Sequence, residues 1–135
     1  MKRLFTLLST TMLTACATTA IPTEHARPAS DVLNDAMTTP RSNTGILIIK
    51  RDEGFMGSAC AIAAFVDKKP LANLRTGEVV TAYLAPGEYV LRAASTGICG
   101  GGDSESPLLI RSGEVRTYRI SIDQGSSIRL GPTTQ

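Results

Sequence analysis

Hydrophobic residues occur in short runs separated by turn residues from Thr44 to the end of the chain. The run in residues 45–51 is hydrophobic on both faces, which is typical of a strand inside a sheet. In residues 114–122 the pattern alternates instead, with Tyr118 on one face and Arg119 on the other. Further strands are predicted in residues 59–66, 71–74, 78–84, 88–94, 108–111 and 127–130. Strands this short, with turns about every 8–12 residues and no helical pattern between them, predict an all-β fold, an antiparallel β-sandwich of seven or eight strands.

The N-terminal fifteen residues have the pattern of a secretion signal. Lys2 and Arg3 are positively charged, and residues 4–15 follow without a charge. That stretch is long enough for the core of a signal peptide and too short to cross a membrane as a helix. The segment Leu13-Thr14-Ala15-Cys16 then resembles the lipobox of bacterial lipoproteins.

The lipobox resemblance implies cleavage before Cys16, a diacylglycerol on its sulfur and an acyl chain on the new amine. Each buried CH₂ of such chains contributes about 0.8 kcal/mol to membrane binding. Enterobacterial lipoproteins with Asp in the next position stay in the inner membrane, and here that residue is Ala17. The resemblance therefore implies a lipid anchor in the outer membrane and a domain that faces the periplasm. The alternative is that Cys16 is an ordinary residue near a cleavage site or in a buried helix.

Cleavage also changes the charge of the chain. The full sequence has 14 Lys and Arg against 12 Asp and Glu, and loss of Lys2 and Arg3 without any acid leaves 12 of each. A chain without net side-chain charge lacks the clustered basic surface that nucleic acids require, so no nucleic-acid partner is expected. With 42% hydrophobic and 19% charged residues, the composition indicates a globular domain.

The mature chain divides into two parts by composition. Residues 16–43 contain three prolines, many Ser and Thr, and no hydrophobic period, which predicts a flexible lipidated tether. A short docked helix that begins at Ser30 and runs to Met37 is the alternative within this stretch. The expected organisation is a signal peptide in residues 1–15, the tether in 16–43 and the β-sandwich domain in 44–135.

The centre of the domain carries a second resemblance. Residues 71–77 and 79–94 contain a strand, a Pro86-Gly87 turn and a strand in which Tyr89 alternates with aliphatic residues. This pattern is similar to PEGA-type and transthyretin-like modules, which are small bacterial sandwich domains found in envelope lipoproteins of unknown function. The resemblance implies a sandwich fold and no shared catalytic residues.

Cys60 and Cys99 remain once Cys16 is assigned to the lipid. Disulfides persist in an oxidising periplasm, so these two residues are predicted to pair. The bridge would close a loop of about 40 residues and stabilise the fold by about 4 kcal/mol in the chain-entropy model. The alternative is a pair of reduced, buried thiols.

Residues 96–106 form the longest irregular stretch of the predicted domain. The candidate binding loop within it comprises Gly100, Gly101, Gly102, Asp103 and Glu105. Its glycines would present backbone N–H groups to a ligand, and its two acids would present charge. The stretch lacks the Lys-Ser or Lys-Thr of a P-loop and the ligand spacing of a calcium loop. The alternative is a flexible connection held at one end by the disulfide.

No residue pattern indicates catalysis, a metal site or a cofactor. His25, the one histidine, lies in the expected tether, where nothing would hold it against a nucleophile. A basic stripe for phosphate, lipid A or peptidoglycan would need alignment of Arg92, Arg111, Arg116, Arg119 and Arg129 on neighbouring strands. The alternative is that these arginines lie on the solvent side of the sheets and pair with Glu78, Glu88 and Glu114.

These observations favour a non-catalytic function at the cell envelope. The first hypothesis is an outer-membrane lipoprotein that binds or assembles with an envelope protein through a sheet face or edge. The alternative is an inhibitor or immunity lipoprotein, whose glycine-rich loop would enter the cleft of a periplasmic hydrolase or toxin.

Overall fold

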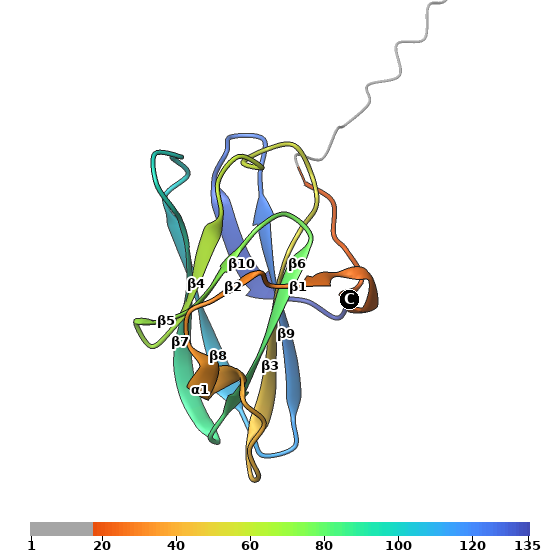
Figure 1. The fold of residues 1–135 in the computed structure, drawn as a ribbon, viewed down its shortest axis with the longest axis vertical. Helices are drawn as coiled ribbons and strands as arrows, with labels where there is room; N and C mark the ends of the chain where they lie inside the picture. The colour runs from red at the N-terminus through yellow and green to blue at the C-terminus, as the bar shows by residue number, and fades with distance from the viewer. Residues whose placement is uncertain (1–17) are drawn as a thin grey trace, which may run out of the picture.

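The computed structural model describes residues 18–135, in which two β-sheets pack face to face (Figure 1). The predicted signal segment and Cys16 lie outside the described residues. The strands are β1 (Arg27–Pro28), β2 (Asp31–Val32), β3 (Gly45–Arg51), β4 (Ile62–Val66), β5 (Lys69–Leu74), β6 (Glu78–Leu84), β7 (Gly87–Ser95), β8 (Asp103–Ile110), β9 (Val115–Ile122) and β10 (Ile128–Pro132). The helical turns are η1 (Thr23–His25) and α1 (Asp35–Thr38). The all-β class is confirmed.

The first sheet has the strand order β1-β6-β3-β9-β10, and the second has the order β2-β5-β4-β7-β8. Most neighbouring strands run antiparallel, as predicted. However, β3 pairs with β9 in parallel, and so does β1 with β6. The expectation of a purely antiparallel sandwich is wrong at these two pairs, because the paired strands are far apart in the chain and no hairpin joins them.

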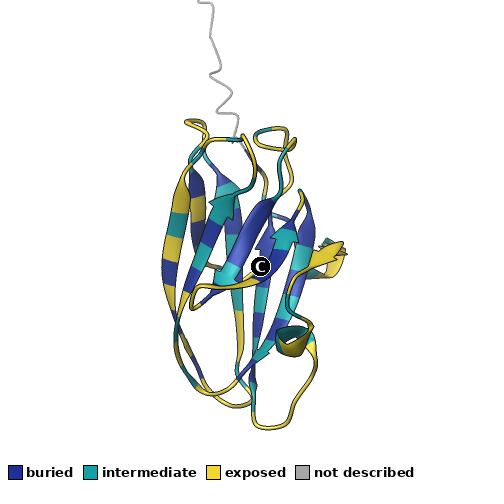
Figure 2. Cartoon of the chain, turned by 60° about the vertical axis from the view of Figure 1, so that its left-hand side comes forward, coloured by how far each residue is buried: buried dark blue, intermediate teal, exposed yellow. Residues whose placement is uncertain are grey.

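The core lies between the two sheets. Leu47 and Ile49 of β3, Leu91 of β7 and Ile120 of β9 have no exposed surface. Along β6 every second residue is buried, which is the period expected of a strand with one face in the core. Figure 2 shows the same alternation of buried and more exposed residues along other strands.

Residues 18–43 lie along one side of the sandwich (Figure 1). The segment crosses between the sheets, because β1 pairs with β6 of the first sheet and β2 pairs with β5 of the second. The side chains of Thr18 and Ile21 are buried. The prediction of a flexible tether is therefore wrong for residues 18–43, whose backbone groups have partners in both sheets.

The alternative, a docked helix from Ser30 to Met37, is also wrong in its bounds. Residues Asp31–Val32 form β2, and a single helical turn, α1, follows Asn34, whose side-chain oxygen accepts a hydrogen bond from the Met37 N–H at 3.1 Å. Met37 packs against the core. No helix within residues 18–135 is long and apolar enough to cross a membrane.

Lys50, near the end of β3, connects the two ends of the described chain. Its buried ammonium donates hydrogen bonds to the backbone oxygens of Ile21 and Gln135. Burial lowers the pKa of Lys50, and the nearby carboxylate of Asp52 opposes this shift. The Lys50 ammonium therefore holds the N-terminal segment against the first sheet through these hydrogen bonds.

Candidate functional site

The structure separates the residues of the candidate binding loop. Gly100, Gly101 and Gly102 lie in the connection between β7 and β8, whereas Asp103 and Glu105 belong to β8. β8 starts at Asp103 because it pairs with β7 along its whole length. The prediction of an irregular stretch through residue 106 is wrong, and the two acids lie on a sheet rather than on a loop.

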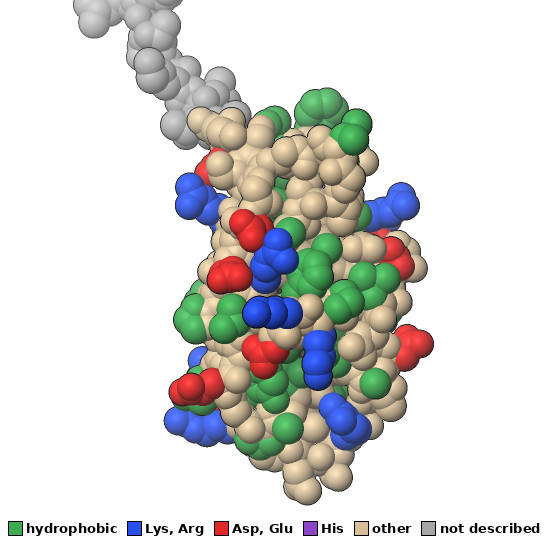
Figure 3. Space-filling view, turned by 90° about the vertical axis from the view of Figure 1, so that its left-hand side faces the viewer, with side chains coloured by type: hydrophobic (Ala, Val, Ile, Leu, Met, Phe, Trp, Pro, Cys, Tyr) green, Lys and Arg blue, Asp and Glu red, His purple; other side chains and the backbone are tan. Residues whose placement is uncertain are grey.

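The two acids contribute to a mixed surface that we call the outer face of the second sheet. It consists of Phe65 on β4, Val90 and Arg92 on β7, and Asp103, Glu105, Pro107 and Leu109 on β8. The strand register places Val90 opposite Pro107, and Arg92 opposite Glu105 and Phe65. Figure 3 looks onto this side of the molecule and shows hydrophobic side chains among charges of both signs.

Exposed hydrophobic groups occupy the middle of this outer face. Val90 and Leu109 are 47% and 48% exposed, although they project from adjacent strands of a well-formed sheet. Pro107 lies beside them on β8, the last strand of the second sheet, where the missing N–H of proline costs no hydrogen bond within the sheet. Neighbouring exposed hydrophobic side chains with a polar rim are typical of protein-binding surfaces.

Two shallow hollows flank Val90. One, of about 340 Å³, is lined by Tyr89, Pro107 and Leu109, with Asp67 and Glu88 at its border. The other, of about 390 Å³, is lined by Asp67, Lys68, Val90, Arg92 and Glu105. Both hollows are open to solvent, and each combines hydrophobic walls with charged groups.

Arg92 is the best-organised charge on the outer face. Its Nε donates a hydrogen bond to Asp103 Oδ2 at 2.8 Å, and its guanidinium carbon lies 5.2 Å from the centre of the Phe65 ring. At the border of the face, the Val90 N–H donates to Asp67 Oδ1 at 2.8 Å. Side chains of the outer face thus hold one another in place, and its carboxylates and cations remain exposed to solvent.

The three glycines contribute to a different place, which we call the loop end. It comprises residues 54–61, 96–102 and 124–127, which belong to three connections between strands at one end of the sandwich (Figure 1). The Cys60–Cys99 disulfide links the first two of these loops, with a Cα–Cα distance of 6.2 Å, and realises the predicted pairing. The Ile128 N–H donates to the Gly101 carbonyl at 3.2 Å and so attaches the third loop.

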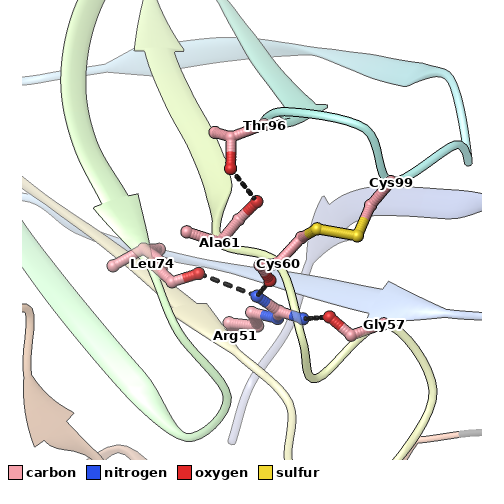
Figure 4. Close-up of a disulfide and its surroundings, with 7 residues drawn as sticks. All are labelled: Arg51, Gly57, Cys60, Ala61, Leu74, Thr96 and Cys99. Atoms are coloured by element: carbon pink, nitrogen blue, oxygen red, sulfur yellow. Dashed lines mark hydrogen bonds between the residues drawn. A yellow bond between two sulfur atoms is a disulfide. The ribbon is translucent and has the colours of Figure 1, made fainter.

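Arg51, the last residue of β3, binds backbone carbonyls of the loop end. Its guanidinium donates hydrogen bonds to the carbonyls of Cys60 and Gly57 at 2.7 Å each, and to that of Leu74 at 2.9 Å (Figure 4). The side chain is buried, and burial lowers its pKa, opposed by the charge of Glu78. The sequence shows Arg51 only as a charge at the end of a strand, and no local pattern indicates that it is enclosed by carbonyls.

The remaining arginines do not form the basic stripe. Arg119 binds the buried Asp52 through three short hydrogen bonds of 2.6–2.9 Å. Arg129 pairs with Asp123, and Arg116 with Glu114. Hydrogen bonds from the Ser127 N–H and from Arg129 keep the pKa of Asp123 below its usual value. Arg92, Arg116, Arg119 and Arg129 therefore pair with acids, but of the three predicted partners, Glu78, Glu88 and Glu114, only Glu114 is one of these acids.

Within residues 18–135 no cluster of three His, Cys, Asp or Glu side chains could hold a metal ion. His25 lies in η1 on the packed N-terminal segment. The described residues present two candidate surfaces, the outer face of the second sheet and the disulfide-linked loop end.

Comparisons with known proteins add little to this description. No family model matches the chain, and no curated protein matches it. A solved structure described as "NMR structure of the protein from Eubacterium rectale" is similar to 69% of this chain over 91% of its own, with 10% sequence identity and a TM-score of 0.45. The function has to be argued from the residues themselves.

Proposed function

We propose that this protein is a lipoprotein of the bacterial outer membrane, anchored through Cys16 and facing the periplasm. Its β-sandwich is a non-catalytic module that binds or assembles with another envelope protein. The lipobox-like segment supports the anchor, and the PEGA-like or transthyretin-like pattern fits a domain of this kind.

The observation that carries the binding role is the outer face of the second sheet. Val90 and Leu109 remain about half exposed in its middle, and charged side chains surround them. Burial of such hydrophobic groups in a complex contributes roughly 25 cal/mol per Å², and a charged rim supplies orientation. The inhibitor alternative, in which the glycine-rich loop enters a cleft, has less support, because Asp103 and Glu105 lie in β8 and leave only the glycines of the candidate loop in the connection before it.

Site-specific photocrosslinking in the native cell tests the binding role. A photoreactive residue at Val90 or Leu109 should give a discrete crosslinked species, whereas one at Ser121, on the outer side of the first sheet, should not. Leu109→Lys should abolish the crosslink from position 90 without lowering the melting temperature, because its ammonium would lie opposite Glu88 in the strand register. Equal crosslinking from positions 90 and 121 would contradict the assignment of this face.

The anchor needs a test of its own. Cells that express the full chain should incorporate labelled palmitate, and Cys16→Ser should give an uncut precursor that takes up none. A Cys16→Ser protein that is still processed and still partitions with detergent would refute the anchor.

A further inference from the structure

We infer that the loop end rests directly on the bilayer surface, with Phe55 and Ile98 inserted at the level of the lipid headgroups. This inference rests on the lipid anchor of the proposed function and adds the orientation of the domain. It concerns a surface separate from the outer face of the second sheet. The partner at the loop end is a lipid surface, and four observations support this choice.

The first observation is exposure. Phe55 is 90% exposed and Ile98 is 103% exposed, which makes them the most exposed large hydrophobic side chains of the described residues. Both belong to the loop end, and the disulfide at Cys99 follows Ile98 directly. Two bulky hydrophobic groups held in water at one end of a sandwich lose their hydration cost when they enter an interface.

The second observation is charge. Residues 54–61, 96–102 and 124–127 contain no Lys, Arg, Asp, Glu or His. The charged residues of the connections at this end, Asp52, Glu53, Arg75 and Asp123, lie next to the ends of the strands. In Figure 3 the tip of this end carries hydrophobic and uncharged atoms, and the charged side chains of that face begin below it. Loop segments without charge avoid the cost of removing charged groups from water at a bilayer surface.

The third observation is the position of the chain that leads to the anchor. Thr18 lies beside the loop end, where its hydroxyl hydrogen bonds with Asp52 Oδ2 at 3.1 Å and with the Ile122 carbonyl at 3.3 Å. The Thr19 N–H donates to the Glu53 carbonyl at 2.7 Å. Cys16 precedes Thr18 by two residues, a reach of about 7 Å at most. A lipid on Cys16 therefore keeps this end, and not another, at the membrane.

The fourth observation is rigidity. The disulfide joins residues 54–61 to residues 96–102, Arg51 of β3 binds carbonyls of the first of these loops, and the Ile128 N–H of β10 binds the Gly101 carbonyl of the second. Groups that are already ordered lose little conformational entropy when they bind. Phe55 and Ile98 are thus presented on a preorganised support.

Tryptophan fluorescence tests this inference, because the chain contains no Trp. The variants are Phe55→Trp, Ile98→Trp and, as a control, Val115→Trp, whose residue is exposed at the opposite end of β9. Each full chain is processed in bacteria, purified in its acylated form and placed in vesicles of phosphatidylethanolamine and phosphatidylglycerol, with or without brominated acyl chains. The indole at position 55 or 98 should show blue-shifted emission and quenching by the brominated lipids, and the indole at position 115 should show neither.

A second substitution sharpens the test. Ile98→Asp in the Phe55→Trp protein should remove most of the quenching, whereas Val115→Asp in the same background should leave it unchanged. Acylated protein that stays in the vesicles with unquenched indoles at positions 55 and 98 would overturn the inference and leave the anchor intact. Contact of the loop end with a protein instead of lipid would have the same meaning. Absence of palmitate from the full chain would instead refute the proposed anchor, and this inference with it.

Discussion

The guanidinium of Arg51 donates a hydrogen bond to the carbonyl of Cys60 at 2.7 Å, so a buried cation holds the backbone of a disulfide-bonded residue. The same group also binds the carbonyls of Gly57 and Leu74. None of these three partners is a carboxylate. The arrangement therefore depends on oxygen dipoles that surround a charge, and it connects β3, the loop after it and β5.

Replacement of Arg51 by Met should strongly destabilise the domain. The variant leaves three carbonyls without their donor, and hydrogen bonds to charged groups contribute about 1.5–3 kcal/mol each, so a loss of about 3 kcal/mol or more is expected. Arg51→Lys keeps the charge but cannot reach all three oxygens, so its free energy of unfolding should lie between those of the parent protein and Arg51→Met. Denaturant unfolding of the unlipidated chain from Ala17 measures both. An unchanged midpoint for Arg51→Met would show that the carbonyl contacts contribute nothing.

Loss of the Cys60–Cys99 bridge should lower the melting temperature by about 10 °C or more, from the roughly 4 kcal/mol of the chain-entropy model. The matched variant is Cys60→Ser with Cys99→Ser, and reduction of the parent protein should reproduce its melting temperature. A thiol assay on the unlipidated Cys16→Ser chain provides the check. Two reactive thiols after denaturation without reductant would mean that the bridge is absent.

Gly101 and Gly100 form a natural pair for testing the shape of the loop end. Gly101 has a φ of +116°, and a Cβ there would lie 2.7 Å from the Ser126 carbonyl oxygen, whereas a Cβ on Gly100 would meet nothing within 4 Å. Gly101→Ala should therefore cost about 1–3 kcal/mol, and Gly100→Ala should be close to neutral. Thermal unfolding of the two variants compares them directly. Equal melting temperatures would contradict the close approach of these loops.

Tyr118 should make the stability fall in alkaline solution. Burial raises its pKa above the ordinary value of 10.0, with partial opposition from Arg116, and its hydroxyl donates to the Pro107 carbonyl at 2.6 Å. Between pH 10.0 and the raised pKa the unfolded chain releases a proton that the folded chain keeps, so the free energy of unfolding decreases as the pH rises. At pH values below this interval, Tyr118 makes its full contribution to the free energy of unfolding.

The measurement for Tyr118 is a comparison with Tyr118→Phe. The parent protein should be more stable than the variant at neutral pH, and this advantage should shrink as the pH rises above 10.0. A constant difference across this range would show that Tyr118 does not titrate in the folded protein above its ordinary pKa.

Local sequence patterns were sufficient for much of the fold. The hydrophobic run that became β3 and the alternation that became β9 identify strands without knowledge of their partners. The disulfide could also be predicted, because the resemblance to a lipobox assigned Cys16 to a lipid and only two cysteines remained. Gly100, Gly101 and Gly102 were correctly predicted to lie in a connection between strands, because glycines are common in loops.

Other elements exist only through distant pairing. The first half of β8 reads Asp-Ser-Glu-Ser and has no hydrophobic period, yet it is a strand because β7 supplies its hydrogen bonds. Within this half, the hydroxyl of Ser104 accepts a hydrogen bond from the Leu130 N–H at 3.1 Å. Similarly, Asn73 donates to Asp31 at 2.7 Å across 42 residues of sequence. Tertiary contacts of this kind outweigh local propensity and leave no local signal.

The packing of residues 18–43 has a consequence for self-association. β1 pairs with two residues of β6 and β2 with two residues of β5, so each covers part of an open hydrogen-bonding edge. Such edges, when bare, pair with strands of other molecules. A chain shortened to Thr44 would present both edges to solvent and would invite a neighbouring copy to donate the missing strands. The N-terminal segment thus reduces the length of open strand edge through which copies of the chain could aggregate.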